Sequence, residues 1–250
     1  MEYHNKVATI PYTKYRILFF EITNLLFIDL ILFLVAIIFK LYQLVFFCIF
    51  VVDMPSKSEL TKQFIIEKTA PVFNEKGYAG TSLADLENAT GLTKGSIYGN
   101  FENKDEVALA AFDYNFNQVS NYIKEKIASH EHAIDRLLVY ADVYRKFFKI
   151  PFLKAGCPIL NTSTESDDTH PRLKVKAANA LHLWKISIEN QIKRGIARNE
   201  IKPDTQPTEF AVILKSLIEG AVMQAKVTER TKELAIAMNY LEKIIRDLQR

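Results

Sequence analysis

The chain of 250 residues has few of the residues on which disulfide-built or collagen-like proteins depend. It contains two cysteines, Cys48 and Cys157, and only eight glycines and eight prolines. Hydrophobic residues make up 49% of the chain, charged residues make up 24%, and the formal net charge is +3. This composition excludes a disulfide scaffold, a collagen-like chain and a disordered chain. It predicts a protein with a sizeable core, and two cysteines fit the reduced interior of a cell.

Glycine is absent from residues 1–53, although all eight glycines follow Met54. This leader holds eight of the 17 phenylalanines and four charged groups of each sign. Residues 30–52 are apolar except for Lys40 and Gln43 and are long enough for a membrane span, although a central lysine costs about 2.5–3.5 kcal/mol. A cleaved signal peptide fits worse, because the apolar region is long and starts late. Three interpretations stay open: a mis-assigned start and a cytoplasmic protein, a transmembrane segment over 17–52 that anchors it in the inner membrane, or a soluble element.

After the leader, signals for the beginning and end of helices follow one another closely. Ser58 precedes a run with helical spacing of apolar residues, which predicts a helix to about Lys76. Pro71 lies inside this run and is expected to kink or break the helix. Gly77 is well placed to cap its C-terminus.

The next segment predicts two short helices and the start of a long one. Ser82 and Asp85 have the spacing of a capping box, and Gly91 permits a tight turn after the first short helix. Thr93 is expected to cap a second short helix that ends near residue 100, and Asn103 to cap the long one. The residues expected to be exposed on the second short helix are Lys94, Gly95, Ser96, Tyr98, Gly99 and Asn100. Two short helices around a glycine turn favour a helix-turn-helix that places its second helix in the DNA major groove. Spacing alone also leaves an ordinary helical hairpin open.

Two runs of this segment resemble the DNA-binding domain of TetR-family transcriptional regulators. Residues 77–86 read GYAGTSLADL and residues 90–106 read TGLTKGSIYGNFENKDE. Family members read approximately GY-x-x-T-[ST]-φ-x-x-I and then aGφ-s-x-x-x-φY-x-x-F-x-x-K, where φ is apolar. Leu86 replaces the usual isoleucine. Gly99 and Asn100 stand where an aromatic or histidine pair is more common, which leaves the base preference open.

The resemblance implies an all-α fold with an N-terminal three-helix DNA-binding domain over 54–106. A helical effector-binding and dimerisation domain would then occupy 107–250. Four apolar positions of the motif would be core residues: Leu86, Leu92, Ile97 and Phe101. The expected contacts to DNA are Thr81, Ser82 and Lys104 at phosphates, Thr93, Lys94, Gly95 and Ser96 at bases, Tyr98 at a phosphate or thymine methyl, and Asn100. Residues 54–106 carry six basic and eight acidic side chains, so DNA affinity would depend on locally placed lysines.

Residues 107–250 show helical spacing of apolar residues and no strand pattern. The last series steps 4-3-4-3 and is close to a heptad seam that can pack against a partner: Leu234, Met238, Leu241, Ile245 and Leu248. TetR-family regulators dimerise through their last two long helices, so the resemblance implies a homodimer. A dimer reads a palindromic operator in double-stranded DNA with half-sites about 34–36 Å apart.

A break in the helical pattern, over 151–171, separates the middle helices. Gly156, Cys157, Pro158 and Asn161 resemble a pattern at the edge of the effector cavity in one TetR subgroup. The resemblance implies a small-molecule effector of unidentified structure in a mostly apolar pocket, and no cofactor or metal. The candidate lining residues are Tyr140, Tyr144, Phe147, Phe148, Phe152, Cys157, Asn161, His182 and Trp184.

Catalytic alternatives rest on residue types alone. Cys157 with His170 or His182 has the composition of a nucleophile and base, and Asp167 and Asp168 with His170 that of a loose metal site. Neither set has the spacing of a known motif. The sequence therefore predicts a DNA-binding regulator, most simply a repressor released from its operator by an effector, and not an enzyme.

Overall fold

The computed structural model describes residues 27, 30–46 and 56–250. The chain divides into two units, Met1–Ser56 and Lys57–Arg250. Within the first unit, residues 30–46 form a helix whose side chains are all exposed. None of the described helices is both long and apolar enough to cross a membrane. The rest of the predicted transmembrane segment over 17–52 lies outside the described residues, except for residue 27.

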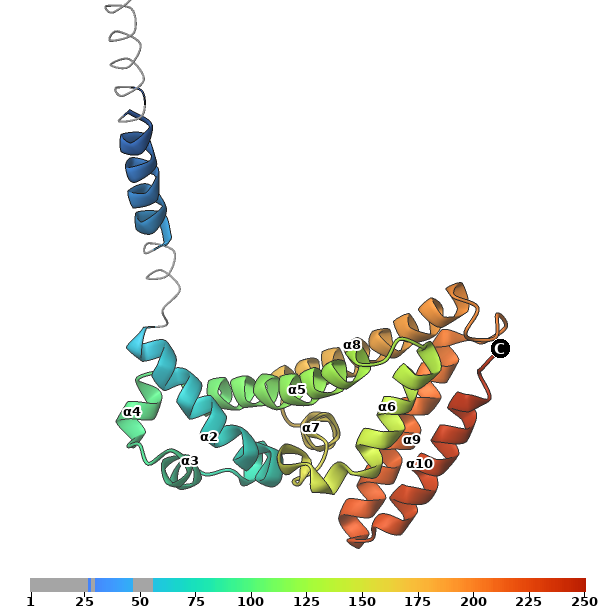
Figure 1. The fold of residues 1–250 in the computed structure, drawn as a ribbon. Helices are drawn as coiled ribbons and strands as arrows, with labels where there is room; N and C mark the ends of the chain where they lie inside the picture. Colours follow the sequence, from blue (N-terminus) through green and yellow to red (C-terminus); the bar gives the residue numbers. More distant parts are fainter. Residues whose placement is uncertain (1–26, 28–29, 47–55) are drawn as a thin grey trace, which may run out of the picture. The chain divides into compact units, whose positions relative to one another are not determined.

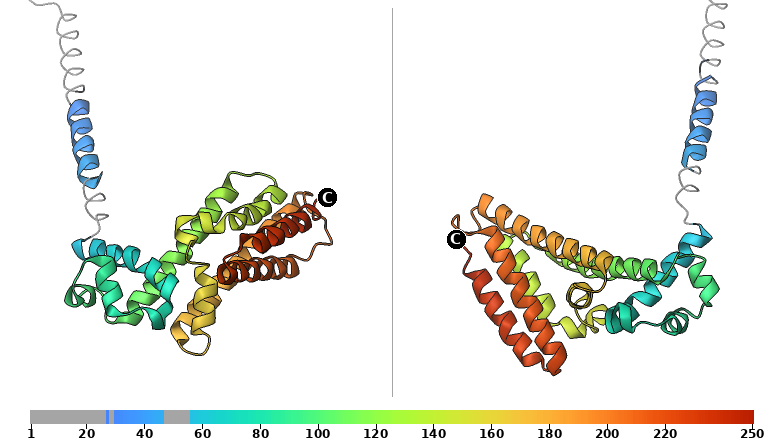
Figure 2. Two further views of the ribbon diagram at one scale, coloured as in Figure 1. Left: turned by 90° about the horizontal axis from the view of Figure 1, so that it is seen from below. Right: turned by 180° about the vertical axis from the view of Figure 1, so that it is seen from behind.

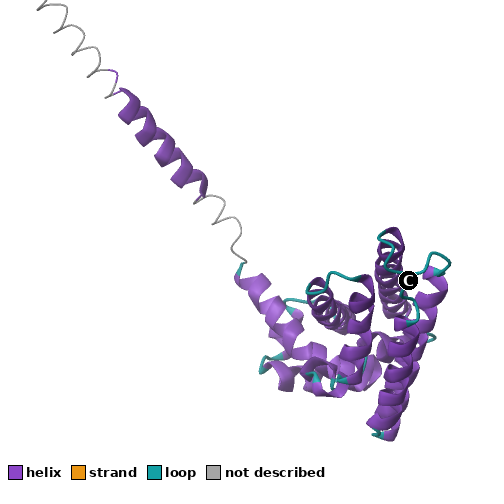
Figure 3. Ribbon diagram, turned by 45° about the vertical axis from the view of Figure 1, so that its right-hand side comes forward, coloured by secondary structure: helices purple, strands orange, loops and turns teal. Residues whose placement is uncertain are grey.

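The second unit is built from helices joined by short loops (Figures 1 and 3). Among the described residues there is no strand, and one isolated bridge pairs Ile201 with Gln249. The α-helices are α2 (Lys57–Gly80), α3 (Leu83–Thr90), α4 (Lys94–Tyr98), α5 (Lys104–Ala128), α6 (Ala133–Arg145), α7 (Pro158–Ser166), α8 (Pro171–Ala197), α9 (Pro207–Thr228) and α10 (Thr231–Arg246). Two short 3-10 helices, η1 (Phe147–Lys149) and η2 (Pro151–Leu153), lie between α6 and α7. The all-α prediction is confirmed.

The helices α2 to α4 share a small hydrophobic core with the start of α5. Leu86 and Ile97 are fully buried and Phe101 is 5% exposed, while Leu92 is partly buried against them. These are the four core positions that the motif predicts. Because these four residues form the contacts with the core, the opposite surface of α3 and α4 stays exposed.

Pro71 does not break α2, contrary to the sequence prediction. The only residue with non-helical φ and ψ inside α2 is Gly77, at φ 72° and ψ 179°. Helix α2 lies along α5 around the proline, and Asn115 of α5 donates a hydrogen bond of 2.7 Å to the carbonyl of Ala70. A polar contact from the neighbouring helix thus stabilises the backbone next to the proline.

A second, larger core joins α5, α6, α8, α9 and α10 (Figure 2). The heptad-like series of α10 belongs to this core and does not form a free seam, since Leu234, Met238, Leu241 and Ile245 are at most 1% exposed. Its side chains pack on α6 and α9 of the same chain. The prediction that this series packs against a partner is therefore wrong.

The expected break over 151–171 contains η2 and the nine-residue helix α7. Pro158 occupies the first turn of α7, where a missing N–H costs nothing. The rest of α7 is rich in serine and threonine, which favour turns, so its helix depends on packing against α8. The break is thus an ordered element between the two cores.

Candidate nucleic-acid interface and ligand cavity

The helices α3 and α4 form a helix-turn-helix with the predicted caps. Ser82 and Asp85 make a reciprocal capping box at the start of α3. Gly91 ends α3 in the left-handed region at φ 70°. Thr93 caps α4, and the Glu87 carboxylate of α3 accepts a 2.7 Å hydrogen bond from the Lys94 amide. One helix therefore holds the first turn of the next, which fixes the angle between them.

The exposed surface of α4 is small and polar. Lys94 and Gly95 are exposed, and Ser96 and Tyr98 are partly exposed. A Cβ atom added at Gly95 would meet nothing closer than the Thr93 hydroxyl at 4.0 Å. This surface allows another molecule to approach the backbone of α4 closely.

Asn100 is engaged inside the protein at both ends of its amide. Its Nδ2 donates to the carbonyl of Ser96 at 2.9 Å, and its Oδ1 accepts from the hydroxyl of Ser58 at 3.2 Å. The side chain therefore joins the end of α4 to the start of α2. A contact between Asn100 and a base would have to replace one of these bonds.

Thr81 is placed differently from its prediction as a phosphate contact. It is 1% exposed, and its hydroxyl donates to the carbonyl of Gly77 at 2.6 Å. The side chain is therefore buried in the turn and its hydroxyl proton is used there, which argues against the predicted phosphate contact. Ser82 beside it is exposed, and its hydroxyl donates to Asp85 at 2.8 Å. The Lys76 ammonium and the Ser82 hydrogen bonds hold the pKa of Asp85 below its usual range.

Lys104 lies at the start of α5, where its Nζ is 4.4 Å from the centre of the Tyr78 ring. Tyr78 in turn donates a short hydrogen bond to the Asp105 carboxylate. This bond and burial raise the pKa of Tyr78 to about 12, so the phenol stays neutral. The ring contact positions Lys104 at a helix N-terminus, where free N–H groups also favour a phosphate.

A polar junction connects this region to the larger core. Asn74 of α2 donates to the carbonyl of Gly156 at 3.0 Å, and Asn161 of α7 donates back to Asn74 at 3.0 Å. The Glu165 carboxylate of α7 accepts hydrogen bonds of 2.8 Å from the amides of Tyr78 and Ala79. Helix α7 therefore holds the backbone just before the helix-turn-helix.

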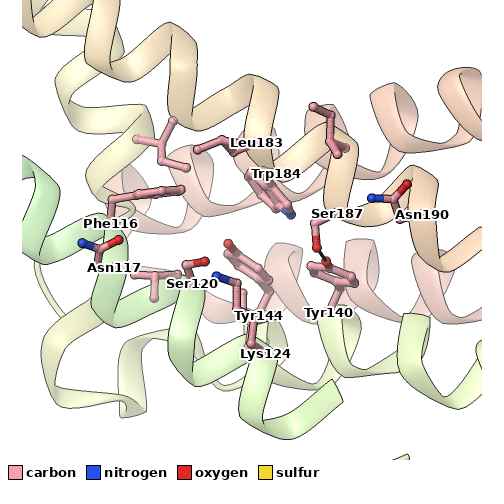
Figure 4. A pocket seen from close by; sticks show the side chains of 14 residues that line it. Phe116, Asn117, Ser120, Lys124, Tyr140, Tyr144, Leu183, Trp184, Ser187 and Asn190 are labelled. Carbon is pink, nitrogen blue, oxygen red and sulfur yellow. Dashed lines mark hydrogen bonds between the residues drawn. The ribbon is translucent and has the colours of Figure 1, made fainter. Parts of the chain in front are cut away.

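A cavity of about 410 Å³ opens between α5, α6 and α8 (Figure 4). Its lining residues are Phe116, Asn117, Val119, Ser120, Ile123, Lys124, Tyr140, Tyr144, Ile159, Leu183, Trp184, Ile186, Ser187 and Asn190. Figure 4 shows the side chains of α5 facing Tyr140 and Tyr144 of α6 and Trp184 of α8 across this space. Its volume lies within the range of about 300–1,000 Å³ that is typical of small-molecule sites.

Aromatic rings dominate one side of the cavity. The rings of Tyr144 and Trp184 are inclined by only 15° with their centres 5.8 Å apart. The hydroxyls of Tyr140 and Ser187 lie 3.4 Å apart, and burial raises the pKa of both tyrosines. The indole Nε1 of Trp184 is buried and has no hydrogen-bond partner among the described residues.

Of the nine predicted lining residues, only Tyr140, Tyr144 and Trp184 line this cavity. The others lie outside its lining: Phe147, Phe148, Phe152, Cys157, Asn161 and His182. Phe147 is fully buried behind Tyr144, and His182 is exposed.

Cys157 belongs to the packed interior. Its thiol donates to the Glu219 carboxylate at 3.0 Å, and burial raises the pKa of the thiol well above its ordinary value. Burial likewise raises the pKa of Glu219 to about 7. A buried thiol of this kind is a poor nucleophile.

Sequence reasoning missed the contribution of α5 to the cavity. Six α5 residues line it with helical spacing: Phe116, Asn117, Val119, Ser120, Ile123 and Lys124. That spacing is visible in the sequence, but a stripe at helical spacing is also what an ordinary packed helix shows.

A helix-turn-helix with an exposed polar second helix, connected through α7 to a helical domain with a cavity, is the arrangement of a DNA-binding regulator. The model for bacterial regulatory proteins of the tetR family matches residues 65–111, and that for the tetracyclin repressor-like C-terminal domain matches 133–241. The chain belongs to the TetR family of transcriptional regulators.

Two solved structures of this family are similar to most of this chain. A TetR-family regulator from Cytophaga hutchinsonii is 44% identical, with a TM-score of 0.73, over 79% of this chain and 98% of that one. A regulator from Chloroflexus aurantiacus is 39% identical, with a TM-score of 0.73, over 78% of this chain and 98% of that one. The HTH-type transcriptional repressor ComR of Escherichia coli is 26% identical over 64% of this chain and 77% of its own length.

Proposed function

We propose that the protein is a homodimeric repressor that leaves a palindromic operator when a small molecule occupies the cavity between α5, α6 and α8. In this proposal residues 54–106 bind DNA and residues 107–250 bind the effector and the second subunit. The exposed polar surface of α4, held at a fixed angle by α3, carries the proposal. ComR, whose name states that it is a repressor, supports the sign of regulation. The protein then works on the chromosome in the cytoplasm, as a regulator and not as an enzyme.

The dimer is proposed to form through α9 and α10. Large apolar side chains remain exposed on these two helices, with Ile213 54%, Ile236 60% and Tyr240 57% exposed. Exposed apolar surface on an otherwise well-packed pair of helices is typical of a protein interface. These exposed side chains are available to contact a second copy of the chain. The buried heptad-like series of α10 is not.

DNA binding is tested by comparing the chain's own upstream region with random DNA of equal length in a mobility-shift assay. We expect tighter binding to the upstream region and a steep loss of affinity with added salt, because phosphate contacts release counterions. Equal affinity for both DNAs would overturn the proposal.

Two lysines are expected to act differently in that assay. Lys104→Ala should weaken binding to operator and random DNA alike and lower the salt slope by about one, because Lys104 is proposed to contact a phosphate. Lys94→Ala or Ser96→Ala should cost about 1–3 kcal/mol on the operator and relax the base preference at one position. Lys149→Ala, at an exposed position of η1 outside the helix-turn-helix and outside the proposed dimer surface, is the matched control. A uniform loss from Lys94→Ala would contradict its role at a base.

A further inference from the structure

The charge in the lining of the cavity is of one sign. Lys124 is the only ionisable residue of unambiguous charge among the lining residues, and that lining includes no aspartate or glutamate. Its ammonium group makes no hydrogen bond, ion pair or ring contact with the part of the chain that the structure describes. An uncompensated cation at an otherwise neutral cavity favours an anion.

The second observation is the orphaned donor of Trp184. An indole N–H can only donate, and this one is buried in a residue that is 8% exposed. A buried donor without a partner costs about 1–3 kcal/mol, which an acceptor atom of a ligand would recover. The side chains of Lys124 and Trp184 can only donate hydrogen bonds, so each would be satisfied by an acceptor atom of a ligand.

The third observation is the arrangement of rings. Tyr144 and Trp184 lie nearly parallel on the same side of the cavity, and Phe116 faces them from α5 (Figure 4). Such surfaces favour offset stacking with a planar aromatic group. At about 410 Å³ the cavity lies near the lower end of the range for ligand sites.

Resting on the proposed function, we propose that the effector is a small aromatic carboxylate, with its ring against Tyr144 and Trp184 and its carboxylate accepting from Lys124. The Trp184 indole offers a second donor beside the cavity. Glu219 interacts electrostatically with Tyr144 but does not line the cavity, so it does not meet the ligand.

Trp184 makes a direct test possible, because it is the single tryptophan of the chain. Its fluorescence reports occupancy of the cavity without DNA. Three probes of matched shape are titrated into the full chain: 3-phenylpropionate, 3-phenylpropan-1-ol and 3-phenylpropylamine. We expect 3-phenylpropionate to bind about tenfold more tightly than the alcohol, and the amine to bind most weakly.

Lys124→Met removes the charge and keeps the length of the side chain. It should reduce the affinity for 3-phenylpropionate about tenfold and leave the affinity for the alcohol unchanged. Lys126→Met, two residues further along α5 and outside the lining, should change neither. Both lysines are exposed, and the one ring contact that Lys126→Met removes, to Tyr122 at 4.8 Å, lies outside the cavity lining.

Equal binding of the acid and the alcohol, no effect of Lys124→Met, or no fluorescence change with any probe at millimolar concentration would overturn the inference. The proposed function is decided separately by the mobility-shift assay. An acid that binds near Trp184 with the expected preference but leaves the operator complex intact would uphold the ligand class and refute release by that ligand.

Discussion

Gly77→Ala is expected to lower the free energy of unfolding by about 4 kcal/mol or more, measured by urea denaturation at fixed protein concentration. Gly77 has φ 72° and ψ 179°, a region that is essentially open to glycine alone and costs other residues about 1–3 kcal/mol. A Cβ atom there would also lie 2.4 Å from Oε2 and 2.6 Å from Oε1 of Glu165. The side chain of Glu165 must therefore move.

Moving Glu165 breaks the contact between α7 and the backbone before the helix-turn-helix. Its carboxylate accepts from the amides of Tyr78 and Ala79, and hydrogen bonds to a charged group contribute about 1.5–3 kcal/mol. The loss therefore combines backbone strain with two broken bonds.

Gly91→Ala separates these two causes. Gly91 also has a positive φ of 70°, but a Cβ there would meet nothing within 4 Å. This variant should cost about 1 kcal/mol, from strain alone. In a Glu165→Ala background, Gly77→Ala should also cost less than in the natural chain. Equal losses for the two glycines would show that the contact with Glu165 carries no energy.

Glu219→Gln is expected to raise the free energy of unfolding at pH 8 by about 1–2 kcal/mol, because an electrostatic gain of about 3 kcal/mol is reduced by burying amide donors where Oε2 has no partner among the described residues. Burial raises the pKa of Glu219 from an ordinary 4.5 to about 7. A difference of about 2.5 in pKa corresponds to about 3 kcal/mol. Glutamine keeps an oxygen that accepts from the Cys157 thiol but carries no charge that must be buried.

The raised pKa of Glu219 also determines how the free energy of unfolding changes with pH. The native state binds the Glu219 proton more tightly than the unfolded state, so this residue costs stability as pH rises from about 4.5 to 7 and the cost is complete above that. The advantage of the Gln variant should therefore be largest at pH 8 and be lost by pH 4.

Glu189→Gln is the matched control with the opposite sign. The Thr208 hydroxyl and the nearby Lys185 and Lys193 lower the pKa of Glu189, so its charge stabilises the native state above its ordinary pKa. This variant should lose stability at pH 8, and the loss should fade as the solution is acidified. A gain from Glu189→Gln, or none from Glu219→Gln, would contradict the assigned electrostatics.

The caps of the helix-turn-helix were predictable from sequence because each is decided by residues within a few positions. Ser82, Thr93 and Asn103 accept the backbone bonds expected of them, and Gly91 takes the left-handed turn. The sequence predicts a break at Pro71 that the structure does not have. The contacts that α2 makes beside Pro71 come from α5, and Asn115 is 45 residues further along the chain than the Ala70 carbonyl to which it donates. Local patterns contain no information about such a partner.

The ligand cavity was less predictable, for the same reason. The sequence predicts Tyr140, Tyr144 and Trp184 as lining residues because they are aromatic and belong to the effector-binding domain. Phe147 meets the same two criteria but is fully buried and does not line the cavity. Which side of a ring faces empty space depends on how α5, α6 and α8 cross. Lys124 carried no sequence signal, because an exposed lysine on a helix is ordinary.

Helix α7 contributes one residue to the cavity and another to the contact with the end of α2. Ile159 lines the ligand cavity, and Glu165 holds the amides of Tyr78 and Ala79. The two residues are six positions apart, which is about 9 Å along a helix axis. If an occupant of the cavity displaced Ile159 and α7 moved as one body, Glu165 and the backbone amides of Tyr78 and Ala79 would move with it.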